Sequence, residues 1–164
     1  MTQSSQKQRQ ANYQLDGVLD DGKHDYRLRV QYEDTDAGGI VYHAQYLAFA
    51  ERARSAWLRC LNIDQKCLLA QEKQAFIVRH IDIDFLRAAA LGDLLGVSSE
   101  VSKIGGARIK LRQTITNMQL CHIVARLVVD IGFVTLQQAG VARACRMPQD
   151  VRDKLAGKER GLLV

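Results

Sequence analysis

Apolar and polar residues alternate strictly just after a polar N-terminal stretch. From Tyr26 to Tyr32 every second residue is apolar, and the residues between them are charged or polar. A period of two places successive side chains on opposite faces of a strand. The pattern therefore predicts a first strand over residues 26–32 with one buried face.

Residues 43–60 show a different period, with apolar side chains recurring at steps of three and four. This spacing is typical of an amphipathic helix, which at 1.5 Å per residue would be about 27 Å long. The apolar positions are Tyr46, Phe49, Ala50, Ala53, Trp57 and Cys60. Residues 62–73 predict a shorter helix or connection, with Asn62 or Asp64 as its N-cap.

Four longer strands follow in succession, and they are rich in Ile, Val and Leu. Short breaks separate them, so we expect neighbouring strands to pair in a meander-like antiparallel sheet. Residues 141–146 would complete the last strand, and Pro148 would open a terminal helix ending at Leu155. The order of elements predicts an α+β fold whose sheet curls around the long helix. The four strands are expected at residues 75–85, 94–103, 107–118 and 121–136.

The 164-residue length is sufficient for one domain with a sizeable core. We expect residues 1–24 to form a flexible polar arm, residues 25–157 a single domain, and residues 158–164 a frayed tail. A net charge of +5 and a pI near 9.2 favour an anionic partner without identifying it. No signal-like or membrane-length apolar run is present, which predicts a cytoplasmic protein without a membrane span.

The four cysteines are scattered, without a C-x-x-C pair or a suitably spaced histidine, so no metal site is expected. The compact chemical cluster of the chain is instead residues 32–43, which join the first strand to the helix. This segment contains two aspartates, a glycine turn and His43 near the expected helix start.

Unpaired backbone N–H groups at a helix start can stabilise the oxyanion formed when an acyl carbonyl is attacked. Asp36 lies seven residues before His43, where its carboxylate could act as nucleophile or as general base for water. Aspartate-rich glycine turns also serve as ordinary loop punctuation, so the residues alone leave catalysis open. For Asp34, capping of the loop is the stronger interpretation.

The order Tyr-Glu-Asp-Thr-Asp-Ala-Gly-Gly-Ile-Val-Tyr-His over residues 32–43, followed by Tyr46 and Glu-Arg-Ala-Arg at 51–54, resembles the 4-hydroxybenzoyl-CoA thioesterase family. Within it, the sequence is most similar to acyl-CoA thioesterases associated with the Tol-Pal cell-envelope system. The resemblance implies a hotdog fold with Asp36 as catalytic carboxylate, and a helix N-terminus at His43 that polarises the thioester carbonyl. It implies an acyl-CoA substrate and no cofactor.

Further residues are candidates for substrate binding. Gly39 lies in the turn, and Tyr42 is expected to line the acyl pocket or to be simple core. Arg79 and Arg108 are available for the CoA phosphates, since cations on strands and turns suit them. Glu51 is expected in a solvated ion pair on the helix or in a subunit contact, and His24, His80 and His122 show no spacing that suggests a role.

The resemblance also implies a homodimer or homotetramer, because hotdog domains generally pair their sheets edge to edge. Two other functions remain as alternatives. The first is a thioesterase of the same fold acting on acyl carrier protein, whose acidic surface would suit the positive charge. The second is a nonenzymatic binding protein. Nucleic acid is not expected as its partner, because basic and acidic residues are interspersed. The preferred acyl chain is left open.

Overall fold

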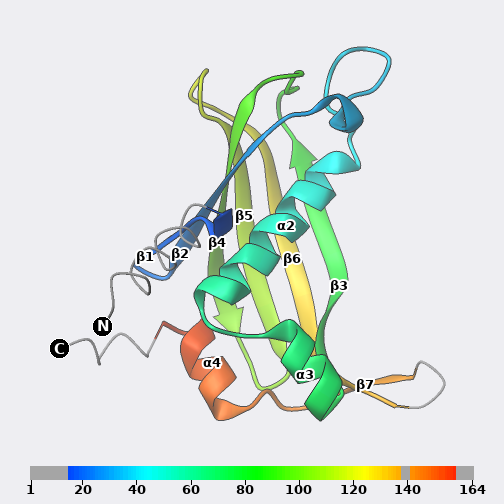
Figure 1. Cartoon of the computed structure of the whole chain (residues 1–164), viewed down its shortest axis with the longest axis vertical. Helices are drawn as coiled ribbons and strands as arrows, with labels where there is room; N and C mark the ends of the chain where they lie inside the picture. Colours follow the sequence, from blue (N-terminus) through cyan, green and yellow to red (C-terminus); the bar gives the residue numbers. More distant parts are fainter. Residues whose placement is uncertain (1–14, 138–140, 158–164) are drawn as a thin grey trace.

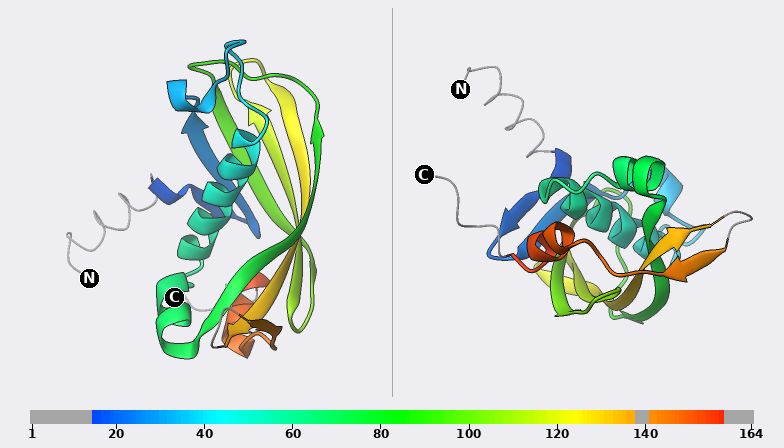
Figure 2. Two further views of the ribbon diagram at one scale, coloured as in Figure 1. Left: turned by 90° about the vertical axis from the view of Figure 1, so that its right-hand side faces the viewer. Right: turned by 90° about the horizontal axis from the view of Figure 1, so that it is seen from below.

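One long helix, α2 (Gln45–Cys60), is wrapped by an antiparallel sheet in the computed structural model, which describes residues 15–137 and 141–157 (Figure 1). Figure 2 shows the helix lying along the concave side of the strongly curved sheet. The predicted α+β architecture is confirmed. The helix begins two residues later than expected from His43 and ends, as predicted, at Cys60.

The core lies between the apolar face of α2 and the concave face of the sheet. Phe49, Ala50 and Ala53 are fully buried on the helix, which confirms the three- and four-residue spacing. Leu111 and Val129 are equally buried on the sheet side. Burying one large apolar side chain of this kind contributes about 1.5–3 kcal/mol. The two alanines present little side-chain bulk, so the helix can lie close to the strands.

The strand order differs from the predicted meander. The strand at residues 75–85 was expected beside the strand at 94–103, but it pairs with the last long strand at the far edge. Residues 86–93 pass along the end of the sheet, where Gly92 N donates to Val30 O at 3.1 Å and Val30 N donates to Asp93 O at 3.0 Å. The segment that looked like a tight turn is therefore a crossover. The order across the sheet is β1 (Val18–Asp20), β2 (Lys23–Arg29), β4 (Leu94–Ile104), β5 (Arg108–Asn117), β6 (His122–Leu136) and β3 (Gln74–Phe85).

The N-terminal prediction is wrong for its last residues. Val18–Asp20 and Lys23–Arg29 form a hairpin, so the sheet begins well before residue 25, and β2 ends before the expected Tyr32. The buried face of β2 includes His24, which continues the alternation of Tyr26 and Leu28 although its side chain is polar. Its Nε2 lies 2.6 Å from the Asp16 carbonyl oxygen. Residues 1–14 of the expected arm lie outside the described residues.

The remaining elements follow the sequence closely. Helix α3 (Gln65–Glu72) begins at Asp64, whose carboxylate accepts from two backbone N–H groups, which confirms this residue as N-cap. Pro148 precedes helix α4 (Gln149–Leu155) as expected. Strand β7 (Ala142–Ala144) is shorter than the predicted strand at 141–146 and pairs with β6. The expected tail at 158–164 lies outside the described residues, and none of the described helices could cross a membrane.

A buried polar network crosses the contact between α2 and the sheet. Arg54, which is 5% exposed, donates to Gln113 Oε1 at 2.7 Å and also to the carboxylate of Glu51. Gln113 donates in turn to Ser99 Oγ at 2.9 Å and to the Ala50 carbonyl at 3.1 Å. The ion pair expected for Glu51 is confirmed, although its cation is buried. Such a network orients the helix because each buried group needs its partner.

The buried histidine predicts pH-dependent stability. Burial lowers the pKa of His24 below its usual 6.5, against the opposing effects of the Asp16 carbonyl and nearby carboxylates. The folded chain then binds fewer protons at this site than the unfolded chain. The contribution of neutral His24 to the free energy of unfolding is therefore complete above pH 6.5, and it is lost as the pH falls below that value.

Urea unfolding between pH 8 and pH 5 should show a smaller decline in the free energy of unfolding for His24→Gln than for the wild type. The exposed His80 provides the matched control, and His80→Gln should decline as the wild type does. Equal declines in the wild type and His24→Gln would contradict this assignment.

Candidate active site

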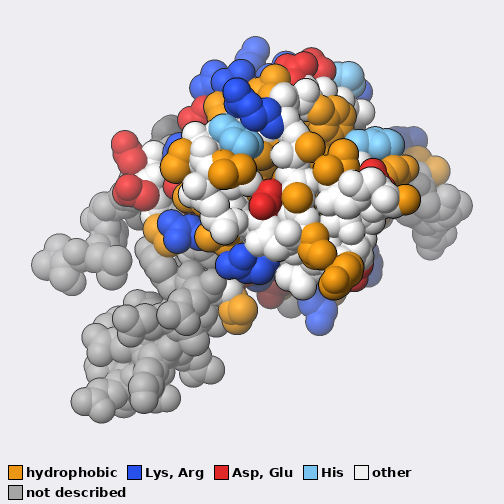
Figure 3. Space-filling view, turned by 90° about the horizontal axis from the view of Figure 1, so that it is seen from above, with side chains coloured by type: hydrophobic (Ala, Val, Ile, Leu, Met, Phe, Trp, Pro, Cys, Tyr) orange, Lys and Arg blue, Asp and Glu red, His pale blue; other side chains and the backbone are white. Residues whose placement is uncertain are grey.

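Residues 35–41 form a tight hairpin that presents Asp36 at one end of the molecule. Asp36 N donates to Ile40 O at 2.9 Å, and Gly39 N donates to Asp36 O at 3.0 Å. Gly39 has φ +75, a conformation that side chains disfavour, which explains a glycine at this position. Figure 3 looks onto this end, where hydrophobic side chains are spread among histidine and charged ones.

The Asp36 carboxylate is exposed and oriented by its own loop. Its Oδ1 accepts a hydrogen bond from Gly38 N at 2.8 Å. An aspartate that accepts from the N–H two residues later forms a local turn with restricted side-chain rotation. The carboxylate is thereby held in one direction while remaining open to a ligand.

Asp34 has the structural role that the sequence suggested. It is 1% exposed, and its Oδ2 accepts from Gln31 N at 2.8 Å, which closes the short 3₁₀ helix η1 (Tyr32–Asp34). Its backbone carbonyl accepts from Tyr42 N at 2.9 Å. Asp34 therefore supports both sides of the hairpin, and the capping interpretation is confirmed.

The N-terminus of α2 follows directly after the hairpin. Its N-cap is Ala44, which provides no side-chain acceptor for the first-turn N–H groups, of which Gln45 N donates to the Tyr42 carbonyl at 2.8 Å. These groups and the helix dipole make the position favourable for negative charge. His43 is exposed in the preceding turn, and its ring lies 4.4 Å from that of Tyr42 and 6.4 Å from that of Phe85, centroid to centroid.

The two tyrosines near this helix start differ in exposure. Tyr42 is 46% exposed, so the alternative that it belongs to the core is wrong. Tyr46 is 3% exposed and does belong to the core. Phe85, at the end of β3, was not singled out by sequence because it fits an ordinary strand pattern; it is 50% exposed beside His43.

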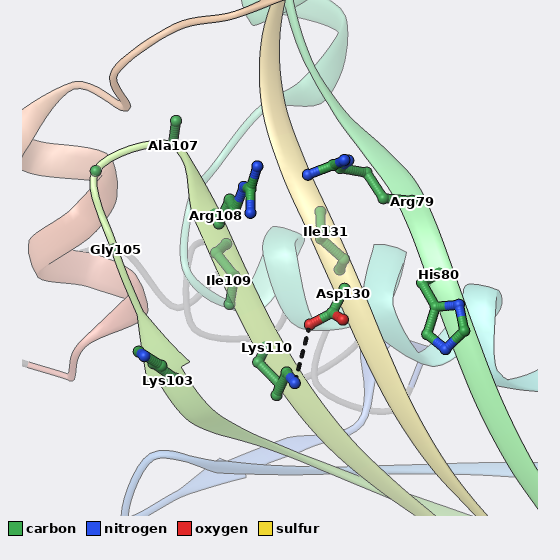
Figure 4. A pocket seen from close by; sticks show the side chains of 11 residues that line it. Arg79, His80, Lys103, Gly105, Ala107, Arg108, Ile109, Lys110, Asp130 and Ile131 are labelled. Atoms are coloured by element: carbon green, nitrogen blue, oxygen red, sulfur yellow. Dashed lines mark ion pairs between the residues drawn. The ribbon is translucent and has the colours of Figure 1, made fainter.

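Arg79 and Arg108 line a separate groove of about 690 Å³ on the sheet. Figure 4 shows both side chains over the strands, with the helices behind the sheet, so the groove is on the face opposite α2. Lys103 and Lys110 line it as well, and Lys110 Nζ pairs with Asp130 Oδ1 at 3.5 Å. Cationic side chains outnumber the one carboxylate, which makes the groove suitable for an anion.

Gly132 on β6 explains how the two arginines approach each other. It pairs with Arg108 on one side and with Ile77 on the other, and a Cβ there would lie 3.1 Å from Arg79 Cδ. The missing side chain lets Arg79 lie across β6 toward Arg108. An isolated glycine inside an apolar strand is a sequence signal for such close approach.

The predicted site residues thus form two groups within one chain. Asp36, Gly39, Tyr42 and His43 lie together at the hairpin and the start of α2. Arg79 and Arg108 lie together in the groove, and Arg79 is separated from Phe85 by six residues of β3, about 20 Å at the rise of a strand.

Comparison with known proteins identifies the family. Residues 38–120 match the Thioesterase superfamily, a segment that begins just after Asp36 and includes His43. The acyl-CoA thioesterase YbgC of Haemophilus influenzae is 42% identical over 135 residues, covering 82% of this chain and 95% of that protein. The chain belongs to the Thioesterase superfamily. It is accordingly a thioester hydrolase.

Solved structures of two thioesterases share the fold of this chain. The 1,4-dihydroxy-2-naphthoyl-CoA thioesterase from Synechocystis superposes with a TM-score of 0.76 at 23% identity, covering 82% of this chain and 96% of that one. The 4-hydroxybenzoyl CoA thioesterase from Pseudomonas sp. strain CBS-3 gives 0.73 at 16% identity, covering 80% and 98%. The hotdog fold implied by the sequence resemblance is confirmed.

The positive φ of Gly39 gives a direct test of the hairpin. Gly39→Ala should lower the free energy of unfolding by about 1 kcal/mol, because alanine disfavours positive φ. It should also reduce thioester hydrolysis, because the turn orients Asp36. Urea unfolding and thiol release measure the two effects.

Gly22 offers a matched control, since it also has φ +75 and open space around its Cα, but lies in the β1–β2 turn. Gly22→Ala should cost similar stability and leave hydrolysis unchanged. Equal losses of activity in both variants would refute a specific role for the Gly39 turn.

Proposed function

We propose that this protein hydrolyses acyl-CoA thioesters to a free acid and CoA, with Asp36 as nucleophile or general base. The observation that carries the proposal is the exposed Asp36 carboxylate, oriented by Gly38 N at the point where the hairpin enters an α2 N-terminus without a side-chain cap. The relatives named acyl-CoA thioesterase support the same substrate class.

In this proposal the thioester carbonyl oxygen lies against the backbone N–H groups at His43 and the start of α2. These donors stabilise the developing oxyanion, and one such donor typically contributes a factor of about 10²–10³ in rate. Asp36 either attacks the carbonyl carbon, forming an anhydride that water then hydrolyses, or removes a proton from the attacking water. In both routes the C–S bond breaks and CoA leaves as the thiol.

Substrate binding is assigned to the remaining predicted residues. Tyr42 and the Gly39 turn would contact the acyl group, since both lie exposed beside Asp36. Arg79 and Arg108 would bind the CoA phosphates in the basic groove, and the long pantetheine arm would connect this groove to the hairpin. Arginine suits phosphate because its planar fork donates two parallel hydrogen bonds.

We also propose a homodimer or homotetramer. β3 is an edge strand of twelve residues, and within the described residues no strand pairs with its outer side. Exposed edges of this length favour pairing with another strand. Val78 and Phe85, which are 43% and 50% exposed, lie on this strand and would gain partners from a second copy. We propose a cytoplasmic location, which suits an acyl-CoA substrate, and a role beside the Tol-Pal system, which rests on the sequence resemblance.

Acyl carrier protein is the second candidate carrier. The groove and the net charge of +5 favour its acidic surface as much as they favour CoA phosphates. The two functions are distinguished by measuring kcat/KM for the same acyl group on CoA and on acyl carrier protein. The carrier with the higher kcat/KM is the preferred substrate.

Asp36→Asn should lower kcat by about 10²-fold or more, because an amide is neither a nucleophile nor a base here. Thiol release from a panel of acyl-CoAs that differ in chain length and aromaticity measures this loss and identifies the preferred acyl class. Asp150→Asn, at an exposed position of α4, is the control and should retain full activity. Full turnover by Asp36→Asn would exclude the proposed role.

Arg79→Gln and Arg108→Gln should each raise KM for acyl-CoA by about three- to tenfold with little change in kcat, because phosphate contacts bind substrate and transition state alike. The difference from wild type should shrink as salt increases. With acyl-pantetheine, which lacks the nucleotide phosphates, the two variants and the wild type should have the same KM. Arg143→Gln on β7 is the control variant and should leave the KM for acyl-CoA unchanged. An unchanged KM would remove these arginines from the phosphate site.

A further inference from the structure

The crossover at residues 86–93 contacts both parts of the candidate active site through a single residue. Ala89 O accepts from Val41 N at 2.8 Å, at the end of the hairpin that contains Asp36. Ala89 N donates to the Tyr46 hydroxyl at 3.1 Å, in the first turn of α2. A β-bridge between Ile40 and Ala90 adds to the hairpin contact. The hairpin and the start of α2 are therefore both hydrogen-bonded to Ala89.

This crossover is itself anchored to the sheet. Asp93 Oδ2 accepts from Ala90 N and from Asn117 Nδ2, both at 2.9 Å. Asn117 is fully buried at the end of β5, and Asp93 O accepts from Val30 N at 3.0 Å beyond β2. Ala89 thus belongs to a segment whose position is set by the end of β5 and by the residue that follows β2.

The covalent link between hairpin and helix is short but not helical. Residues 42–44 connect Val41 to the first residue of α2 as a turn. A turn of this length fixes the distance between the two parts and leaves their relative angle to other contacts. The Tyr46 hydroxyl provides such a contact, because it connects α2 to the residue that also binds the hairpin.

We propose that Tyr46 is a positioning residue, whose hydroxyl sets the α2 N-terminus relative to the Asp36 carboxylate through Ala89. The inference rests on the proposed function, in which Asp36 and the first N–H groups of α2 act on opposite sides of one carbonyl. An error of about 1 Å between such groups can cost about 10²-fold in rate.

The environment of Tyr46 favours a role in positioning over a role in proton transfer. Its ring packs edge to face on Phe49 and Phe85, with centroids 6.1 and 5.6 Å away. Burial raises the pKa of the Tyr46 hydroxyl above its usual 10, so it stays protonated at neutral pH. Tyr46→Phe keeps the ring contacts and removes the oxygen, which leaves the buried Ala89 N–H without its acceptor.

Steady-state hydrolysis by full-length Tyr46→Phe tests the inference. We expect kcat to fall about 10- to 100-fold, while KM changes less than about threefold, since the substrate-binding side chains remain. The shape of the pH profile of kcat should match that of the wild type, because Tyr46 transfers no proton. A profile that changes shape, or a kcat within twofold of wild type, would overturn the positioning role.

Trp57→Phe is the matched control for loss of stability. Trp57 is 3% exposed on the same helix, about three turns further along. We expect this variant to lower the melting temperature while its kcat, measured well below that temperature, stays within about twofold of wild type. If Trp57→Phe and Tyr46→Phe lose kcat equally, the effect of Tyr46 is general destabilisation and the inference fails.

Amide hydrogen exchange provides a readout that does not depend on activity. Peptides covering residues 36–46 and 86–93 should exchange faster in Tyr46→Phe than in the wild type, and should be unchanged in Trp57→Phe. Unchanged exchange in Tyr46→Phe would overturn the inference. If the wild type hydrolyses no acyl-CoA, the proposed function fails, and exchange alone then decides whether Tyr46 holds hairpin and helix together.

Discussion

The packing of α2 against the concave face of the sheet is the contact on which the rest of the molecule depends. Fully buried Phe49, Ala50 and Ala53 face the strands, and the buried Arg54–Gln113 pair sets the orientation of the helix at the same contact. Because the helix is held along its length, its N-terminus occupies a defined place at one end of the sheet. The hairpin that carries Asp36 leads directly into that end.

Precision at the candidate site comes from backbone hydrogen bonds more than from catalytic side chains. Asp36 is oriented by Gly38 N, Asp34 ties the two sides of the hairpin, and Ala89 contacts hairpin and helix together. Backbone groups of a tight turn have little freedom, so they preserve geometry at small entropic cost.

Sequence reasoning succeeded where the signal is local. The period of the helix, the N-cap at Asp64, the helix that follows Pro148 and the capping role of Asp34 all depend on residues within a few positions of each other. It failed at His24, because the polar stretch before residue 25 was expected to form a flexible arm, whereas His24 is buried on β2. It also failed at the neighbour of β3, because a crossover containing glycine resembled a turn.

The sequence by itself determined the long helix, the four longer strands and the short segment that carries Asp36, Gly39, Tyr42 and His43, since these residues are close along the chain. Only the tertiary structure decided that β3 lies beside β6 and that Arg79 and Arg108 share a groove over Gly132. It alone joined Tyr46 to Ala89 across 43 positions. Such contacts depend on the pairing register of distant strands, and hydrophobic periodicity indicates which face of a strand is buried without identifying its neighbour.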